Sequence, residues 1–307
     1  MVRSHGLWHE VSPHADGGPS VLIATLRGGL KRERRGTDVV AVGDHVWYRE
    51  LPDNEAIIEA VEPRTRTLGR TARHTRDVEQ VILANPDLVF FVFAVHHPEP
   101  HPRMLDRFII LAELQDIPIQ LVITKMDLDG KDGAPPAREV FADYAGTYPL
   151  HFVSMRSGEG LDDLRAAMEG RISAVAGPSG VGKSSLLNYL DPDAERDTSS
   201  VSMATGKGRH TTVGSRLHRL NATTFVADTP GMRSLAMVAV DPARLDWCYR
   251  EFRPCLGHCF YADCTHDHEP NCAVRAAVDE GVIPQGRYES YLVLRRGEEL
   301  QMPADTW

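Results

Sequence analysis

The amino-acid sequence predicts a multidomain protein in which a small all-β barrel is followed by an α/β domain and then by a mainly α-helical, cysteine-rich unit. Three observations predict this division. Residues 1–80 contain short alternating apolar runs broken by Gly and Asp. In residues 81–238, patterns typical of buried strands alternate with helical ones. All five cysteines fall in the last part, residues 239–307. A chain of 307 residues is long enough for two or three such domains.

In the first region the apolar runs cover residues 20–26, 39–48 and 56–61, and none has a 3.6-residue period. Short strands separated by turn residues are typical of a small all-β barrel. The region also holds two basic clusters, Arg27, Lys31, Arg32, Arg34 and Arg35 in one and Arg64, Arg66, Arg70, Arg73 and Arg76 in the other. A barrel with basic loops fits an OB-fold that binds RNA, but the same charges would also suit an ordinary solvated surface.

The second region alternates strand and helix patterns. Apolar runs predict buried strands at residues 88–95, 118–124, 150–154 and 172–176. Helical spacing predicts helices over residues 103–115 and 161–168. This alternation implies a parallel sheet covered by helices on both faces.

The composition excludes several classes of protein. With 42% hydrophobic and 25% charged residues, the chain is neither fibrous nor largely disordered. Its formal net charge of −9 argues against a protein that coats nucleic acid with its whole surface. No apolar run approaches the roughly 18 residues of a membrane span, and the first residues contain no secretory signal. We therefore expect a cytoplasmic protein with no membrane partner.

A phosphate-binding loop is the most specific single motif. Residues 177–184 fit the pattern G-x-x-x-x-G-K-[ST], between a predicted strand and a predicted helix. The glycines let backbone N–H groups turn toward a β-phosphate, and the following helix presents its N-terminus to the anionic charge. Lys183 would reach the β- and γ-phosphates, and the Ser184 hydroxyl would ligate Mg²⁺. The candidate nucleotide-binding residues here are Gly177, Pro178, Ser179, Gly180, Val181, Gly182, Lys183, Ser184 and Ser185.

A second phosphate element is predicted after the apolar run 225–227, where Asp228 begins the sequence Asp-Thr-Pro-Gly. An Asp at a strand end opposite the phosphate loop can hold Mg²⁺ through a water molecule. The backbone N–H of Gly231 can contact the γ-phosphate. Alone this tetrapeptide is an ordinary turn, and its position 44 residues after Ser184 is what indicates a function.

The nucleotide base is predicted to be guanine. Thr124-Lys125-Met126-Asp127 follows a buried strand and matches the [NT]-K-x-D pattern of GTPases. The Asp127 carboxylate would accept both the N1–H and the exocyclic amine of guanine, a pair of donors that adenine does not offer. Lys125 would pack along the base plane. At the end of the next strand, Ser154 and Met155 lie where a backbone N–H would meet guanine O6.

The order of these motifs is unusual, because the guanine motif at 124–127 precedes the phosphate loop at 177–184. Ordinary GTPases have the reverse order. A sheet can keep its geometry when the chain is cut and rejoined elsewhere, since termini usually lie at the surface. The sequence therefore predicts a circularly permuted GTPase domain that leads directly into the cysteine-rich unit.

The cysteine-rich unit contains a candidate metal site. Cys259, Cys264, His266 and Cys272 supply three thiolates and one imidazole, a set suited to a closed tetrahedral Zn²⁺ site with a structural role. Five cysteines in a reducing compartment argue against a disulfide framework. Spacing leaves rival ligands open, namely Cys248, Cys255, His258 and His268, although Cys248 fits buried packing in a helix-like stretch.

Barrel, permuted GTPase and Cys-His unit together resemble the RsgA/YjeQ family of GTPases that depend on the small ribosomal subunit. The resemblance spans roughly residues 20–290. It rests on GPSGVGKSS at 177–185, GRHTT at 208–212, DTPG at 228–231, TKMD at 124–127 and CFYADCTHDHEPNC at 259–272. It implies an OB-fold (1–80), a circularly permuted GTPase domain (81–238) and a zinc-binding domain (239–307). The implied task is late maturation of the 30S subunit, with contact to 16S rRNA and GTP hydrolysis that the subunit stimulates. We expect a monomer.

The resemblance also assigns residues that spacing alone does not. Thr211 or Thr212 should ligate Mg²⁺ in the GTP state. Met232 stands where Ras-type enzymes place a water-orienting Gln, so intrinsic turnover should be slow. The family's proposed substitute falls on His210, whose alternative is a loop histidine with no role. The candidate catalytic residues are thus His210, Lys183 and Gly231.

Three positions depart from the family pattern. Thr124 replaces the commoner Asn, which removes an amide that would reach base N7 and brace the phosphate loop. We therefore expect weaker guanine affinity, with selectivity retained through Asp127. Met155 replaces a small residue, and Val213 stands where a third Thr is frequent.

Two other functional classes stay open at this point. In one, the protein is a binding module whose nucleotide only fixes its shape. In the other, a permuted GTPase acts on the 50S subunit or on another RNA, although such a protein would need neither the zinc unit nor the basic barrel.

Overall fold

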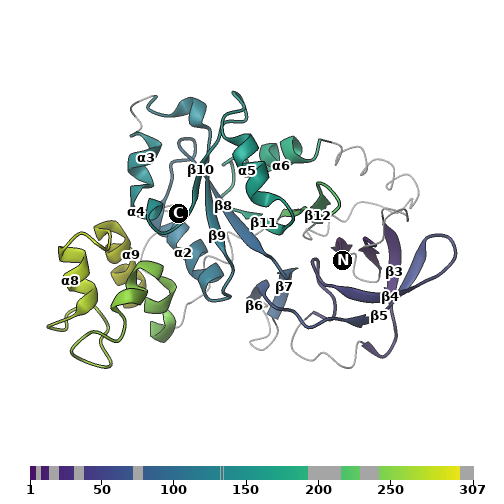
Figure 1. Ribbon diagram of the computed structural model, residues 1–307, viewed down its shortest axis with the longest axis horizontal. Helices are drawn as coiled ribbons and strands as arrows, with labels where there is room; N and C mark the ends of the chain where they lie inside the picture. Colours follow the sequence, from purple (N-terminus) through teal and green to yellow (C-terminus); the bar gives the residue numbers. More distant parts are fainter. Residues whose placement is uncertain are drawn as a thin grey trace.

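The computed structural model describes residues 1–4, 8–13, 21–30, 38–71, 79–131, 133, 135–192, 216–228 and 242–297. Figure 1 shows a central α/β domain with the N-terminal strands on one side and the C-terminal helices on the other. No helix in the described ranges is long and apolar enough to span a membrane.

The central sheet confirms the predicted α/β domain. Its strands lie in the order β10 (Leu150–Phe152), β9 (Ile119–Thr124), β8 (Leu88–Ala94), β11 (Ile172–Ala176), β13 (Phe225–Asp228) and β12 (Arg216–Arg219). The first five are parallel, and β12 pairs antiparallel with β13. Every residue of β8 is buried, because helices cover both faces of the sheet at its centre. The antiparallel strand β12 is absent from the sequence-based prediction.

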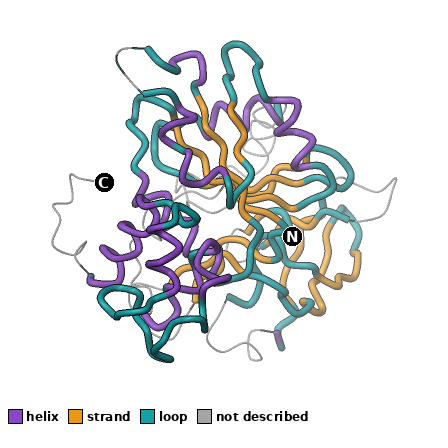
Figure 2. The backbone as a smooth tube through the Cα atoms, turned by 60° about the vertical axis from the view of Figure 1, so that its left-hand side comes forward, coloured by secondary structure: helices purple, strands orange, loops and turns teal. Residues whose placement is uncertain are grey.

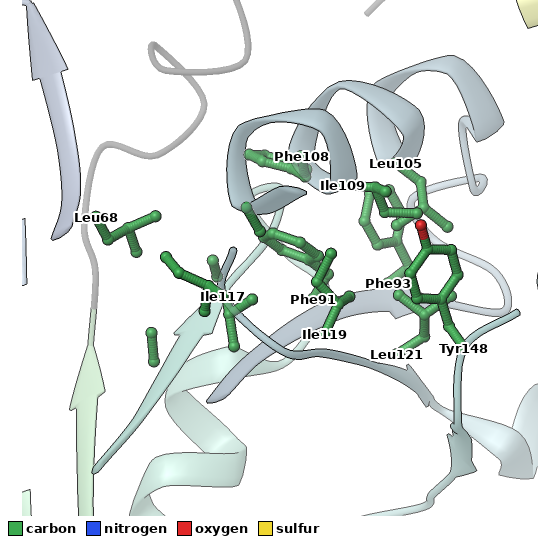
Figure 3. Close-up of a cluster of buried hydrophobic side chains, with 14 of the residues drawn as sticks. Leu68, Phe91, Phe93, Leu105, Phe108, Ile109, Ile117, Ile119, Leu121 and Tyr148 are labelled. Carbon is green, nitrogen blue, oxygen red and sulfur yellow. The ribbon is translucent and has the colours of Figure 1, made fainter. Parts of the chain in front are cut away.

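Helices on opposite faces create two cores. Helix α2 (Pro102–Glu113) covers one face, and α5 (Leu161–Met168) and α6 (Lys183–Leu190) pack in the core on the other. In Figure 3, Leu105, Phe108 and Ile109 of α2 lie over side chains of β8 and β9. The rings of Phe108 and Phe91 stack with centroids 5.5 Å apart. The predicted segments 161–168 and 172–176 are confirmed to the residue, and 103–115 is confirmed within two residues at each end.

Shorter elements complete the domain. Met126–Leu128 forms the 3₁₀ turn η1, and two single-turn helices, α3 (Ala137–Val140) and α4 (Ala142–Ala145), precede β10. A hairpin of β6 (Thr67–Thr71) and β7 (Glu79–Ala84) forms a separate two-stranded sheet. The predicted domain boundary between residues 80 and 81 falls inside β7.

The N-terminal strands extend the same hydrogen-bonded sheet. Beyond β12 the order continues through β1 (Arg3–Ser4), β2 (His9–Val11), β3 (Leu22–Leu26), β5 (Glu55–Val61) and β4 (Val46–Glu50). Strand β1 pairs antiparallel with β12, with Arg3 opposite Arg216 in the register. The first residues of the chain therefore lie along the β12 edge of the central sheet. Val11, Leu22, Ala24, Ala56 and Ile58 form a separate small core. Over the described residues this order runs without closing on itself, and the OB-fold barrel stays a prediction.

The predicted strand at residues 39–48 is wrong in its first part. Only Val46–Glu50 is a strand, and residues 41–44 form a turn. The buried carboxylate of Asp44 holds this turn, since it accepts the Ala41 N–H at 2.7 Å. Arg64 pairs with both oxygens of Asp44, at 2.7 and 2.8 Å, and only 8% of its side chain is exposed. Arg64 is thus an internal ion-pair partner and drops out of the predicted basic surface.

The C-terminal unit is mainly helical, as the sequence predicts. It consists of η3 (Pro242–Arg244), η4 (Asp246–Cys248), η5 (Arg250–Cys255), α8 (Ala273–Asp279) and α9 (Gln285–Arg296). Figure 2 shows these helices as a group apart from the N-terminal strands. Arg287 of α9 is 2% exposed and pairs with Asp106 of α2 and with Glu251. The buried Arg287–Asp106 ion pair therefore attaches this unit to α2, on one face of the α/β domain.

Candidate nucleotide and metal sites

The phosphate loop lies between β11 and α6, where the motif predicts it. Its residues are Gly177, Pro178, Ser179, Gly180, Val181 and Gly182, followed by Lys183, Ser184 and Ser185 in the first turn of α6. Gly177 has φ +153°, and a Cβ there would lie 2.1 Å from the Val92 carbonyl oxygen. Only glycine fits this close approach between the loop and β8.

Lys183 lies over the phosphate loop. Its Nζ donates to the carbonyl oxygens of Gly177 at 2.9 Å and Pro178 at 2.5 Å. Burial lowers the pKa of this amine, and the nearby Asp228 carboxylate partly opposes the shift. Asp228 ends β13 in register with Val175 of β11. The structure thus brings the predicted cation and carboxylate of the phosphate site to one edge of the sheet.

The guanine motif lies at the end of β9, which β8 separates from β11 in the sheet. Thr124 is the last residue of β9 and is 1% exposed. Its hydroxyl lies 2.5 Å from the Val181 carbonyl oxygen and 3.2 Å from that of Phe93. The contact with Val181 braces the phosphate loop, so the brace expected to be missing without the Asn side chain is present. The Thr124 hydroxyl forms this contact in place of the amide of the commoner Asn.

The Asp127 carboxylate is held by the side chain of Ser154, for which the sequence predicts only a backbone role. The Ser154 hydroxyl donates to Asp127 Oδ1 at 2.8 Å. Ser154 is fully buried, and its backbone N–H donates to the Glu159 carbonyl oxygen at 3.1 Å. Within this segment the Met155 N–H is therefore the candidate for guanine O6. The signal in the sequence for this side-chain role is a serine at the end of the predicted strand 150–154.

Two further hydrogen bonds shape this edge. The Met126 N–H donates to the Val153 carbonyl oxygen at 3.2 Å, which ties the motif to the segment after β10. Lys125 adopts a left-handed backbone with φ +62°, and its Nζ donates to the His97 carbonyl oxygen. Sequence reasoning did not identify His97, whose loop follows β8.

Four predicted site residues lie outside the described residues, namely His210, Thr211, Thr212 and Gly231. Their roles stay predictions.

The four predicted metal ligands come together. The ligand atoms of Cys259, Cys264, His266 and Cys272 all lie within 4.8 Å of one another. His266 Nδ1 lies 3.5 Å from Cys259 Sγ and 3.4 Å from Cys272 Sγ, and the two sulfurs are 3.8 Å apart. Three thiols and one imidazole converging on one point fit a metal ion that prefers sulfur and nitrogen. This cluster could hold such an ion.

The rival ligands are not part of this cluster. Cys248 is fully buried, donates to the Arg244 carbonyl oxygen at 3.2 Å and packs among apolar side chains. Burial raises the pKa of its thiol to about 12, so the metal-binding thiolate form is disfavoured. The interpretation of Cys248 as a packing residue is confirmed.

Comparisons with known proteins cover almost the whole chain. A family model described as RsgA GTPase matches residues 61–238. The "Small ribosomal subunit biogenesis GTPase RsgA" of Gemmatimonas aurantiaca is 46% identical over 275 residues, which is 89% of each chain. The protein of the same name from Thermotoga maritima is 38% identical, over 88% of this chain and 87% of that one.

Solved structures agree with this result. The crystal structure of YjeQ from Thermotoga maritima has a TM-score of 0.75 and 32% identity, and the match covers 96% of each chain. YloQ, described as a circularly permuted GTPase, has a TM-score of 0.76 and 26% identity over 99% of this chain and 95% of that one.

Proposed function

The chain belongs to the RsgA GTPase family and is a GTP hydrolase with a role in ribosome biogenesis, and from this premise we propose that it acts on the 30S subunit, which stimulates its hydrolysis of GTP. The reaction converts GTP and water to GDP and phosphate during late maturation of that subunit. The protein works as a monomer in the cytoplasm and binds 16S rRNA.

The observation that carries the choice of nucleotide is the Asp127–Ser154 hydrogen bond. The buried Ser154 hydroxyl restrains the carboxylate, and the neighbouring Thr124 connects the motif to the phosphate loop. Base recognition and phosphate binding therefore share one rigid edge. The Asp127 carboxylate, which is half-buried, accepts two donors from guanine, whereas the same edge of adenine offers no such pair of donors.

The phosphate chemistry follows from the same edge. Lys183 would exchange its carbonyl contacts for phosphate oxygens and neutralise their charge. Ser184 and one of Thr211 and Thr212 would hold Mg²⁺, and Asp228 would contact the ion through a water molecule. Mg²⁺ supplies charge neutralisation and orients the phosphates when bound. The Gly231 N–H would contact the γ-phosphate, and His210 would orient the attacking water.

The metal in the Cys-His cluster is a structural Zn²⁺, with Cys259, Cys264, His266 and Cys272 as its four ligands. A four-ligand site has no open position for catalysis. The chain divides into an OB-fold (1–80), the GTPase domain (81–238) and this zinc-binding domain (239–307). A small unit of this kind owes much of its folding free energy to the ion.

Contact with rRNA comes from the basic residues of the first region other than Arg64. Arg27 is exposed and Arg66 is half-buried, so both guanidinium groups can approach phosphates. Confining positive charge to one face of an acidic protein restricts binding to a matching RNA surface.

The testing experiment is phosphate release from GTP, with ATP in parallel, in the absence of ribosomes and with purified 30S or 50S subunits. We expect strong stimulation by 30S subunits alone and no release from ATP. Lys183→Ala serves as the inactive control for contaminating nucleotidases, and His210→Ala should lose the stimulated rate. Equal stimulation by 50S subunits, or none by 30S subunits, would contradict the proposal.

A further inference from the structure

The metal ligand His266 has two different neighbours at its two ring nitrogens. Its Nδ1 faces the sulfurs of Cys259 and Cys272, as the distances above define. Its Nε2 faces away from them and lies 3.7 Å from Oδ2 of Asp246. Asp246 is in η4, outside the 259–272 loop that carries all four ligands. The ring therefore lies between the cluster and a carboxylate from a separate segment.

The imidazole is held in place from several sides. His266 is 3% exposed, and its carbonyl oxygen accepts the Tyr288 hydroxyl at 2.7 Å. The rings of Phe252 and Tyr291 lie 6.4 and 6.3 Å from the imidazole centroid. Because the imidazole is buried and has aromatic rings among its neighbours, a polar partner for Nε2 has to come from a specific side chain.

Asp246 is placed to be that partner. Its Oδ1 accepts the N–H of Trp247 at 2.7 Å, which fixes the carboxylate and leaves Oδ2 directed at the imidazole. The Asp246 carbonyl oxygen also accepts the Tyr249 N–H at 3.2 Å, so backbone contacts hold the turn. One carboxylate oxygen of Asp246 thus accepts the Trp247 N–H, and the other faces the imidazole of His266.

This arrangement has a consequence for metal binding. A neutral imidazole that gives one nitrogen to a metal carries its proton on the other, and an acceptor there fixes both the proton and the orientation of the ring. We propose that Asp246 is the positioning residue of the metal site, holding the Nε2 proton of His266 so that Nδ1 stays directed at the ion. The inference rests on the proposed zinc site and adds a residue that lies 13 positions before its first ligand.

The proposal also links two parts of the chain. Through His266, the ion would stabilise η4 as well as its own loop.

The experiment measures Zn²⁺ affinity of the full chain by competition with a chromogenic chelator. Asp246→Asn keeps the size of the side chain and an oxygen for the Trp247 N–H, and removes the anionic acceptor. We expect roughly 10- to 100-fold weaker Zn²⁺ binding, the range typical of removed outer-shell partners. Asp246→Glu, which keeps a carboxylate, should recover part of the affinity. The matched control is Asp267→Asn, because Asp267 neighbours His266 in sequence but pairs with Arg296. Its affinity should stay close to the wild-type value.

A second measurement separates positioning from simple structural support. Guanidinium unfolding is compared for wild type and Asp246→Asn with Zn²⁺ and with EDTA. The variant should lose stability with Zn²⁺ and show little difference from wild type in EDTA. Equal losses in both conditions, or unchanged Zn²⁺ affinity in a protein that binds Zn²⁺ tightly, would overturn the role of Asp246. A wild-type protein without tight Zn²⁺ binding would instead overturn the zinc site itself, and the role of Asp246 with it.

Discussion

The hydroxyl of Thr124 lies 2.5 Å from the carbonyl oxygen of Val181, which joins the base-recognition strand to the phosphate loop. The two residues are 57 positions apart and meet because β9 and the loop after β11 end at the same edge of the sheet. Thr124 is buried, so water does not compete for this hydrogen bond. The contact makes the position of the phosphate loop depend on the guanine motif.

Removing this hydroxyl should weaken nucleotide binding. Thr124→Val keeps the shape of the side chain but leaves the Val181 carbonyl oxygen without its donor, at a cost of about 1–2 kcal/mol. We expect a roughly 5- to 30-fold increase in Kd for both GTP and GDP, measured with a fluorescent guanine nucleotide. Thr124→Ser keeps the hydroxyl and should bind nearly as wild type. Equal affinities of the Val and Ser variants would show that the brace contributes nothing.

Changing the carboxylate of Asp127 should change the base that is bound. Asp127→Asn replaces an acceptor oxygen by a donor, which no longer suits the guanine amine but suits the C2 carbonyl of xanthine. We expect GTP affinity to fall by roughly 10- to 100-fold, the usual range when one bidentate pairing with a base is removed. Xanthosine triphosphate should bind the variant more tightly than GTP does, measured by displacement of a labelled nucleotide. Unchanged preference for GTP would contradict the role of Asp127.

Arg287 should be important for stability. Its buried guanidinium pairs with Glu251 at 2.5 Å and with Asp106. The guanidinium carbon also lies over the ring of Tyr249, 4.5 Å from the ring centroid. These two carboxylates hold the pKa of Arg287 well above its ordinary value although burial opposes the charge. Arg287→Met leaves two buried carboxylates without their cation, which costs about 3–5 kcal/mol of the free energy of unfolding.

The measurement for Arg287 is chemical denaturation at constant Zn²⁺. Arg275→Met is the matched control, since its guanidinium is exposed and donates to the Glu269 carbonyl oxygen at 3.2 Å. The control should lose less than about 1 kcal/mol. A similar loss in both variants would mean that the buried network adds no stability beyond an ordinary surface arginine.

Arg64 and Arg66 should differ in effect although they are two residues apart. Arg64→Ala removes the partner of the buried Asp44 and should lower stability, measured by thermal unfolding. Arg66→Ala should leave stability nearly unchanged and weaken binding to 30S subunits. The slope of log K against log salt should also become less steep, by about 1 for each phosphate group that the variant no longer neutralises.

The outcome that would contradict this assignment is an Arg64→Ala variant of normal stability with weak subunit binding. Subunit binding by the wild-type protein that does not respond to salt would contradict phosphate contact altogether.

Local patterns in the sequence predicted the regular elements well. The apolar spacing of residues 161–168 and the run 172–176 are confirmed to the residue, because each pattern reports which side chains face a core. The phosphate loop was found because its glycines are required by backbone sterics within a few residues. The ligand cluster was found because Cys259, Cys264, His266 and Cys272 lie within one short loop, so their spacing restricts how they can meet.

The sequence by itself thus determined the parallel strands of the central sheet, the helices over 103–115 and 161–168, the nucleotide motifs and a candidate ligand set for the metal site. The antiparallel strand β12 and the exclusion of the rival ligands came only from the structure. Only the tertiary structure decided which polar side chains meet across long stretches of chain: Ser154 with Asp127, Arg64 with Asp44, Arg287 with Asp106 and Asp246 with His266. The periodicity of apolar residues and the need for glycine both arise among residues that are close in the chain. They can therefore be predicted from the sequence. A buried polar group must find a partner when water is excluded, and that partner is whichever residue the packing of distant elements brings within reach.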